Sequence, residues 1–354
     1  MNLKKSNKKF ISIIWGYHTQ IFDFHKEQNY HMMPFEVMME QGYECELFAI
    51  DSRVNISDDP HFIKGVKVTY YKNILSYLLY LYKNRENVIY SNSLTIKTLL
   101  VGLIGKNTFF YPHDNIFGRT GKNIIKICII KFFYRFFTKI RINNTDEKKA
   151  LDVIRKGLGY ICPLPISADF YSDKKQNRSD AVFIGNLTSA KNPEFLIDTC
   201  KILRDRKIHF QIHIIGEDRY SKNGRNFSDL VQENNLESSM ILHGFLEPKE
   251  IKKRLHKSLI YINTSLGEGQ CLAVYEGALA GNILCLPNIM SFPSVFHKNA
   301  FYHNNPQGLA DNIMNILQDT QKYQKSIEKT QKMIGEKYSY ETIKKQLTQL
   351  FDER

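Results

Sequence analysis

Two glutamates, Glu268 and Glu276, stand eight positions apart in the segment S-L-G-E-G-Q-C-L-A-V-Y-E-G-A-L-A-G-N-I-L-C-L-P, residues 265–287. Short apolar runs precede them at residues 259–262 and follow them at residues 283–286. This order predicts a strand, a loop, a helix and a second strand of a parallel sheet. Carboxylates accept hydrogen bonds from hydroxyl groups, so the pair could hold one polyhydroxylated ligand.

Glycines flank the first of these carboxylates, at Gly267 and Gly269. The spacing predicts that the helix opens beside them, with Glu268 at its mouth and Glu276 about two turns deeper. Free amide N–H groups and the positive end of the helix dipole favour a phosphate there. The alternative is a capped, solvated amphipathic helix, but the G-E-G and A-L-A-G runs before a strand favour a ligand site.

Strands and helices are expected to alternate through both halves of the chain, with turn formers and charges in the linker that follows residue 165. The expected strands are residues 9–16, 43–50, 66–71, 87–90, 108–111, 181–185, 210–215, 240–242, 259–262 and 283–286. Helices are expected at residues 32–41, from 192, near 227, from 248 and through most of 307–354. Two such halves predict an α/β protein of two Rossmann-like domains, with the ligand cleft between them.

The segment from residue 182 to residue 287 resembles the retaining GT-B glycosyltransferases of family 4, the E-x7-E type of the glycosyl transferases group 1. The resemblance implies two facing Rossmann-like domains with a C-terminal helical segment. It implies an acceptor-side domain at residues 1–165, a nucleotide-sugar domain at 166–335, and a helix at 336–354 that can cross back to the first domain. In this family one glutamate meets the transferred sugar and the other holds the ribose, roles that would fall to Glu268 and Glu276.

Further donor-binding residues follow from the same resemblance. The run V-F-I-G-N-L-T-S-A-K is similar to the family's strand and turn that bind the donor diphosphate, which implies roles for Gly185 and Lys191. Asn186 stands where the family carries an arginine, so one charged, bidentate phosphate contact is missing. The remaining residues implied for the donor are Gly216 at a strand exit, Gly244 and Phe245 at the nucleobase, and Gly269, Gln270, Cys271 and Leu272 beside the sugar. Gln270 and Cys271 depart from the commoner E-G-F-G-L pattern, which bears on the identity of the sugar.

In the first half the resemblance is weaker and implies two site residues. His113 in Y-P-H-D-N follows a predicted strand, where family members carry a histidine that contacts the donor sugar near its anomeric centre. Gly16, after the first strand, matches the family's acceptor and phosphate loop. The catalytic residues implied are therefore His113, Glu268 and Lys191.

No Asp-x-Asp motif occurs in the chain, so we expect no metal and no cofactor besides the nucleotide-diphosphate sugar as co-substrate. Lys191 and the helix N-terminus would stabilise the leaving diphosphate instead. A glycosidase needs its two carboxylates on either side of the scissile bond, whereas Glu268 and Glu276 lie on one element. Phosphorolysis on the same fold would need a cofactor site, and none is evident in the sequence.

Residues 61–141 carry fourteen Lys and Arg against two acids, Glu86 and Asp114. Apolar, aromatic runs lie within this window at residues 74–82 and 124–137, and both are too short to span a bilayer. Together with Lys122, Lys126, Lys131 and Arg135, they predict contact with an anionic membrane surface. The alternatives are core helices with ordinary lysines, or a nucleic-acid surface, for which no motif is present.

The six cysteines, at positions 45, 128, 162, 200, 271 and 285, are scattered singly, which predicts a reducing, cytoplasmic compartment. The sequence therefore predicts a metal-independent retaining glycosyltransferase, peripheral on the inner face of the cell membrane. It would move a sugar from a nucleotide-diphosphate sugar to a glycan or lipid-linked acceptor in surface polysaccharide or glycoconjugate assembly. The alternative is a catalytically silent GT-B protein that binds nucleotide sugar or scaffolds a partner enzyme. The base, the sugar, the acceptor, the linkage and the oligomeric state are left open.

Overall fold

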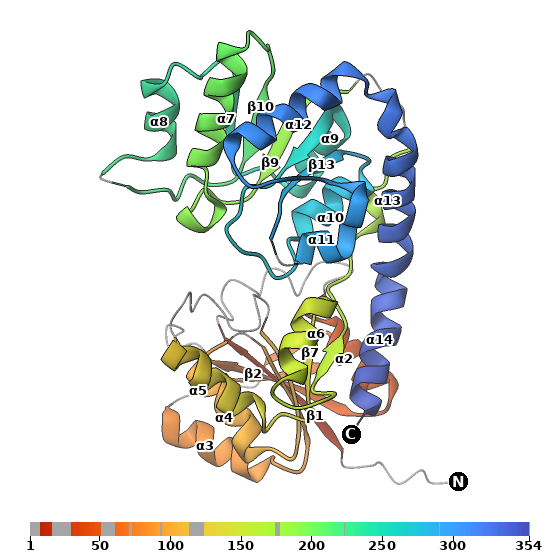
Figure 1. The fold of residues 1–354 in the computed structure, drawn as a ribbon. Coiled ribbons are helices and arrows are strands. Elements are labelled where there is room, and N and C mark those ends of the chain that lie inside the picture. Colours follow the sequence, from red (N-terminus) through yellow and green to blue (C-terminus); the bar gives the residue numbers. More distant parts are fainter. Residues whose placement is uncertain are drawn as a thin grey trace. The chain divides into compact units, whose positions relative to one another are not determined.

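The computed structural model describes residues 8–15, 30–50, 61–70, 73–92, 94–112, 124–173, 178–222, 224–289 and 291–353 of the 354-residue chain. The chain divides into two compact units (Figure 1). The first unit comprises Met1–Pro165 with Tyr340–Arg354, and the second comprises Ile166–Ser339. Each unit is a sheet covered by helices on both faces.

Within the described residues, the first unit contains an eight-stranded sheet of order β3-β4-β2-β1-β5-β6-β7-β8. Its neighbouring strands run parallel, except that β3 runs antiparallel to β4. The strands are β1 Lys9–Trp15, β2 Glu44–Ile50, β3 His61–Ile63, β4 Val66–Tyr70, β5 Val88–Asn92, β6 Asn107–Tyr111, β7 Lys139–Ile142 and β8 Gly159–Ile161.

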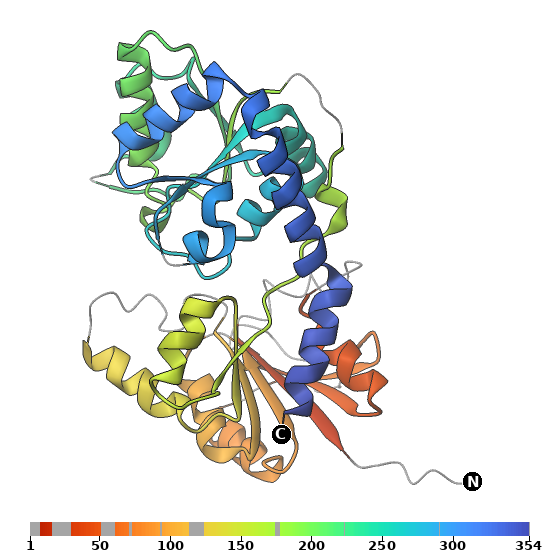
Figure 2. The ribbon, with the colours of Figure 1, turned by 45° about the vertical axis from the view of Figure 1, so that its right-hand side comes forward.

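Side chains alternate along the central strands of this sheet, so each strand contributes to two cores. Ile11 and Ile13 of β1 pack in one cluster with buried residues of α3, α4, α5 and α6. On the other face, the ring of Phe10 contacts Phe35 of α2 and Phe351 of α14. Both views show α2 and α14 apart from α3, α4 and α5, with the sheet between them (Figures 1 and 2). The helices are α2 Met33–Glu40, α3 Ile74–Lys83, α4 Ile96–Ile104, α5 Ile124–Tyr134, α6 Thr145–Asp152 and α14 Tyr340–Asp352.

The second unit has, in its described part, a six-stranded parallel sheet of order β11-β10-β9-β12-β13-β14. Ile260 and Ile262 of β12 pack on one face with α7, α8 and α12, and Tyr261 between them packs on the other with α9, α10, α11 and α13. The strands are β9 Ser179–Ile184, β10 Ile212–Ile215, β11 Met240–Gly244, β12 Ser258–Ile262, β13 Ile283–Pro287 and β14 Phe301–His303. The helices are α7 Glu194–Asp205, α8 Phe227–Glu233, α9 Pro248–Lys257, α10 Leu272–Leu279, α11 Ser291–Phe296, α12 Pro306–Gln318 and α13 Gln324–Lys337, with short 3₁₀ turns at Ala168–Phe170, Ser189–Lys191, His297–Asn299 and Gln321–Tyr323.

The predicted alternation of strands and helices is confirmed, as is the helical C-terminal segment, which contains α12, α13 and α14. Four short strands were not predicted: β3, β7, β8 and β14. No helix in the described part of the chain is both long and apolar enough to cross a membrane.

Candidate functional site

Three glycines line the carboxyl edge of the sheet in the second unit. Gly185, Gly216 and Gly244 lie at the exits of the neighbouring strands β9, β10 and β11. The N–H of Gly185 donates to the carbonyl of Ile215 (2.8 Å), and the N–H of Gly216 donates to the carbonyl of Gly244 (2.8 Å). In a parallel α/β sheet, this edge is where ligands bind. Phe245, which follows Gly244, is 66% exposed at the same edge.

Glycine is required at Gly216 because the two strand exits touch. A Cβ atom there would lie 2.3 Å from the carbonyl oxygen of Gly185, closer than any real side chain approaches backbone. Its φ of +140° is also one that L side chains rarely adopt. The close approach leaves bare backbone at the centre of the edge, which a phosphate group could reach without meeting a side chain.

The loops after β9 and β12 are joined by backbone and side-chain bonds. The N–H of Leu266 donates to the carbonyl of Ala190 (2.9 Å), and the hydroxyl of Thr264 donates to the carbonyl of Lys191 (2.7 Å). These bonds fix the Lys191 backbone beside the loop that carries Glu268. The aliphatic stem of Lys191 folds back over Gly185, where an added Cβ would meet its Cε at 3.4 Å.

Lys191 and Glu268, distant in sequence, form an ion pair. The ammonium group donates to Oε1 of Glu268, and the two side chains are 25% and 14% exposed. Ser265 donates to the same oxygen through its hydroxyl (2.6 Å), while its own N–H donates to Oδ1 of Asn263 (2.9 Å). The carboxylate is therefore oriented by two donors and the ammonium lies next to Gly185, so both can act on one ligand at this edge.

Helix α10 begins later than predicted, at Leu272 with Cys271 as its N-cap, so Glu268 lies in the preceding loop. The predicted opening at Gly267 and Gly269 was wrong because side chains hold this loop out of the helix. Ser265 binds Glu268, and the hydroxyl of Ser291 donates to the carbonyl of Gly269 (3.3 Å). The side chain of Cys271, its N-cap residue, makes no capping hydrogen bond with described residues, so the first N–H groups of α10 can bind a ligand or solvent.

Glu276 lies in the second turn of α10 and is only partly exposed. Burial raises the pKa of its carboxyl group to about 7, because a low-dielectric environment disfavours the charged form. Among the described residues, no side chain or amide bonds this carboxyl group. This carboxyl group, which no described residue bonds, can accept hydrogen bonds from an incoming diol in its ionised form.

Cys271 is 7% exposed, and burial raises the pKa of its thiol to about 12. The thiol is therefore protonated near neutral pH and does not act as a nucleophile. Its sulfur accepts a bond from the amide of Asn263 (3.6 Å), so it helps to shape the loop that carries Glu268. Gln270 and Leu272, on either side of it, are partly exposed.

Asn186, in the position of the family's arginine, binds the neighbouring loop. Its Oδ1 accepts the N–H of Glu217 (3.0 Å), just after Gly216. A backbone ladder continues this contact, since the N–H of Leu187 donates to the carbonyl of Glu217 (2.9 Å) and the N–H of Arg219 to that of Leu187 (3.1 Å). The side chain thus ties two strand exits together.

Arg219 places a second cation in this loop. Its side chain is 60% exposed, and its guanidinium group is paired with the carboxylate of Glu217, whose N–H donates to Asn186. Neither the family pattern nor the local sequence singled out Arg219. It was missed because its neighbour Leu187 lies 32 positions earlier in the chain, and only the parallel pairing of these two segments brings them together.

Ser265, Thr264 and Asn263 were also missed, although they follow directly on β12. All three are buried and bind within the two loops described above. A signal existed in the sequence, because a run of three small polar residues at the exit of an apolar strand is suited to binding loop backbone. His303 at the end of β14 joins them, since its Nε2 lies 3.0 Å from the carbonyl oxygen of Asn263.

The donor-site residues predicted in the second half thus lie on one edge of one sheet or on α10 beside it. Gly16 and His113, predicted in the first half, lie outside the described residues. Among the residues that the structure describes, no three His, Cys, Asp or Glu side chains are grouped as a metal site.

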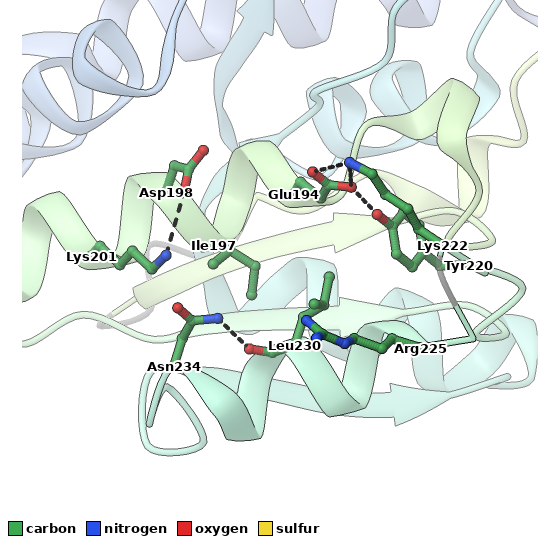
Figure 3. Close-up of a pocket in the computed structure, with 9 residues that line it drawn as sticks. All are labelled: Glu194, Ile197, Asp198, Lys201, Tyr220, Lys222, Arg225, Leu230 and Asn234. Carbon is green, nitrogen blue, oxygen red and sulfur yellow. Dashed lines mark hydrogen bonds and ion pairs between the residues drawn. The ribbon is translucent and has the colours of Figure 1, made fainter.

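A cavity of about 300 Å³ lies elsewhere in the second unit, between α7 and α8 (Figure 3). Its lining residues bind one another, since the side chains of Tyr220 and Lys222 both donate to Glu194, and the side-chain amide of Asn234 donates to the backbone carbonyl of Leu230 (2.7 Å). None of the residues predicted to bind the donor is among those drawn around it.

The chain is similar to known proteins in part of its sequence and in its fold. Residues 168–333, just under half of the chain, match the family model "Glycosyl transferases group 1". The chain is 30% identical over 126 residues to a tRNA-queuosine alpha-mannosyltransferase of Drosophila melanogaster. That match covers 36% of this chain, which spans about a third, 32%, of the length of this curated relative.

Two solved structures resemble the whole chain in fold. Sucrose-phosphate synthase from Thermosynechococcus elongatus superposes with a TM-score of 0.73 at 14% identity, covering 98% of both chains. Anabaena Alr3699/HepE in complex with UDP gives a TM-score of 0.74 at 15% identity, covering 98% of this chain and 100% of that one. The predicted fold class is thereby confirmed. Residues 168–333 form a glycosyl transferases group 1 domain, and the chain that carries this domain has the GT-B fold.

Proposed function

We propose that this protein transfers a sugar, with retention of anomeric configuration, from a nucleotide-diphosphate sugar to a glycan or lipid-linked acceptor. The observation that carries the proposal is the Lys191–Glu268 pair at the glycine-lined edge, with Glu276 eight residues further on. One cation for the diphosphate, one carboxylate for the sugar and one for the ribose are the groups that such a donor requires. HepE, which shares the fold, has been solved with UDP-glucose.

The chemistry assigned to the site is stabilisation of a leaving group. Negative charge grows on the diphosphate as the bond from the anomeric carbon to the phosphate oxygen breaks. We assign Lys191 and the uncapped start of α10 to this charge, in place of a metal ion. Glu268 would orient the sugar hydroxyls, and His113 would contact the sugar near its anomeric centre. The departing phosphate would take the proton of the attacking acceptor hydroxyl, so no protein nucleophile is needed.

We assign the donor by class, as a nucleotide-diphosphate sugar. The Drosophila relative is named a mannosyltransferase, and HepE is solved with UDP and UDP-glucose. These names differ in sugar, and Gln270 and Cys271 depart from the common family pattern beside the sugar. We place the acceptor in surface polysaccharide or glycoconjugate assembly and the protein at the cytoplasmic face of the cell membrane, because exposed apolar and basic side chains gather on its first unit.

A second candidate is a catalytically silent protein that binds a nucleotide sugar or scaffolds a partner enzyme. Asn186 favours it, since an amide supplies no charge to a diphosphate and its oxygen is already bonded to Glu217. Against it stand Lys191, Glu268 and Glu276, the three charged groups that the proposed enzyme would use.

A thermal-shift panel of UDP-, GDP- and ADP-linked sugars tests the proposal. A ligand at 100 times its dissociation constant stabilises the fold by about 2.7 kcal/mol. We expect one base to raise the melting temperature by about 5 °C or more. Slow release of the free nucleoside diphosphate from that donor would then separate the enzyme from the silent protein. If no donor raises the melting temperature, nucleotide-sugar binding is contradicted for the enzyme and for the silent protein alike.

Arg219 is expected to supply the charge that Asn186 lacks. Replacing it with alanine should raise the KM for the donor about 10-fold or more, since a hydrogen bond to a charged group contributes about 1.5–3 kcal/mol. Arg225→Ala is the matched control, because Arg225 belongs to the same loop, is similarly exposed and pairs with Glu233. If the two variants have the same KM for the donor, Arg219 does not bind the diphosphate, and the catalytically silent alternative is strengthened.

A further inference from the structure

One face of the first unit is apolar on its outside. Helices α3, α4 and α5 lie together over one side of the sheet in both views (Figures 1 and 2). Each anchors this layer through a few buried residues, such as Tyr77 and Leu81 of α3, or Ile130 and Tyr134 of α5. Helix α5, I-I-K-I-C-I-I-K-F-F-Y, buries only those two of its eleven residues, although most of its side chains are apolar.

The apolar residues that remain are exposed. Ten of the seventeen exposed large hydrophobic side chains in the described residues belong to α3, α4 and α5. Ile124 and Ile125 are the most exposed of these ten, at 75% and 73%. An apolar helix surface of this kind is normally covered by something. The docking face is defined here by Leu75, Leu79, Ile96, Ile124, Ile125 and Phe132.

The charge around the docking face is mostly positive. Basic side chains stand on the three helices or directly after them, at Lys83, Arg85, Lys97, Lys126, Lys131 and Arg135. Across residues 73–92, 94–112 and 124–138 the sequence carries one acid, Glu86, and this acid is paired with Lys106 and Arg85. The surroundings of the face are therefore strongly positive, which complements an anionic partner.

We propose that the docking face lies on an anionic lipid bilayer, with its isoleucine, leucine and aromatic side chains among the acyl chains and its lysines and arginines at the phosphates. Exposed aliphatic chains rimmed by cations are the pattern of helices that lie in the membrane interface. An RNA surface would combine cations with stacking aromatics, and branched aliphatic side chains give nothing to a phosphate backbone. This docking also implies that the acceptor is lipid-linked and is presented from the membrane, an inference that rests on the proposed function.

Vesicle sedimentation tests the docking without using activity. The full-length protein should bind vesicles of phosphatidylglycerol and phosphatidylcholine at low salt, ignore pure phosphatidylcholine, and dissociate as salt rises, since screening acts within about 10 Å at 0.1 M. The triple substitution Lys126→Gln, Lys131→Gln and Arg135→Gln should weaken partition roughly 100-fold, at about five-fold for each charge. The predicted membrane residue Lys122 lies outside the described residues and is left unchanged.

Matched variants separate docking from net charge. Lys249→Gln, Lys253→Gln and Lys257→Gln remove three exposed charges from α9 of the second unit and should retain most of the binding. Ile125→Ser with Phe132→Ser should abolish binding while the melting temperature stays near wild type, because both side chains are exposed, whereas core helices would lose stability. Leu317→Ser on α12 is the apolar control.

Several outcomes would overturn the docking. One is that the protein does not bind anionic vesicles at low salt, and another is that the α9 and α5 variants lose vesicle binding equally. A third is that the protein binds a tRNA more tightly than vesicles and that the α5 variants lose this tRNA binding. A fourth is that the protein is a dimer and that Ile125→Ser with Phe132→Ser makes it a monomer. The nucleotide-sugar thermal shift should be unchanged in the docking variants. If the protein binds vesicles but no nucleotide sugar shifts its melting temperature, the docking is supported and the proposed function is contradicted. If a nucleotide sugar shifts the melting temperature but vesicles do not bind, the proposed function is supported and the docking is contradicted.

Discussion

Replacing Lys191 with alanine is expected to lower the turnover number about 10²–10³-fold, the loss found when one preorganised donor is removed from a developing negative charge. The ammonium lies beside Gly185 and touches Glu268, so it can meet the bridging phosphate and the sugar-binding carboxylate together. Its value is greatest when the diphosphate leaves, and KM for the donor should therefore change much less than the turnover number.

The same substitution should leave the melting temperature within about 4 °C of wild type. The Lys191 side chain keeps 25% exposure, and Ser265 still bonds Glu268 when the ammonium is absent. Lys191→Arg should recover part of the turnover, because the charge returns with a different shape. Steady-state kinetics beside a thermal melt measure both effects. A variant that loses stability and activity in proportion would show that Lys191 only holds the loops together.

The absence of a metal role is checked in the same assay. With Lys191 as the cation, EDTA should leave the wild-type rate unchanged, and added Mg²⁺ or Mn²⁺ should not rescue Lys191→Ala. Strict dependence of the wild-type enzyme on either ion would contradict the metal-free mechanism, because a divalent ion would then carry the leaving-group charge.

Local pattern was sufficient to predict most of the architecture. The strands β1, β2, β9 and β12 are apolar runs that end at turn formers, and periodicity alone indicates them. The strands that were missed are short or carry charges. The sequence of β7, K-I-R-I, contains Arg141, which is 2% exposed yet donates to the carbonyls of Cys162 (2.5 Å) and Pro163 (2.6 Å). No sequence window shows that a guanidinium will meet two backbone carbonyls more than twenty positions away.

The candidate site also has features that the sequence predicts and features that it does not. Glycines at strand exits and the spacing of Glu268 and Glu276 are visible in the sequence because they reflect local geometry. The pairing of Lys191 with Glu268 and the bond from Glu217 to Asn186 join separate crossover units. They depend on which strands are neighbours, and this is known only once the sheet order is known. The late start of α10 has a similar cause, since Ser291, which binds Gly269, comes from beyond the next strand.

Glu276→Gln should weaken the binding of a nucleotide-diphosphate sugar about 10- to 100-fold, since hydrogen bonds to a charged acceptor contribute about 1.5–3 kcal/mol. The amide is isosteric with the acid, so the helix should remain folded. Its oxygen can accept from one ribose hydroxyl, but its NH₂ group meets the other as a second donor. Isothermal titration with the sugar conjugate measures the loss. Unchanged affinity would remove Glu276 from the ribose.

The pH dependence of the same binding gives an independent check. Burial raises the pKa of the Glu276 carboxyl to about 7 in the ligand-free protein, so the acid is mostly neutral at pH 6 and mostly ionised at pH 8. The folded protein favours the neutral carboxyl group. The free energy of unfolding therefore falls as the pH rises from the pKa of this group in the unfolded chain to about 7.

The pH dependence of binding has the opposite sign, because ribose hydroxyls donate to the ionised form of Glu276. Affinity should therefore rise about 10-fold from pH 6 to pH 8, with a proton released on binding at the lower pH. A nucleotide sugar has no phosphate that titrates in this window, and Glu276→Gln should abolish the slope. A slope that survives this substitution would have to come from another group and would leave Glu276 without the proposed role.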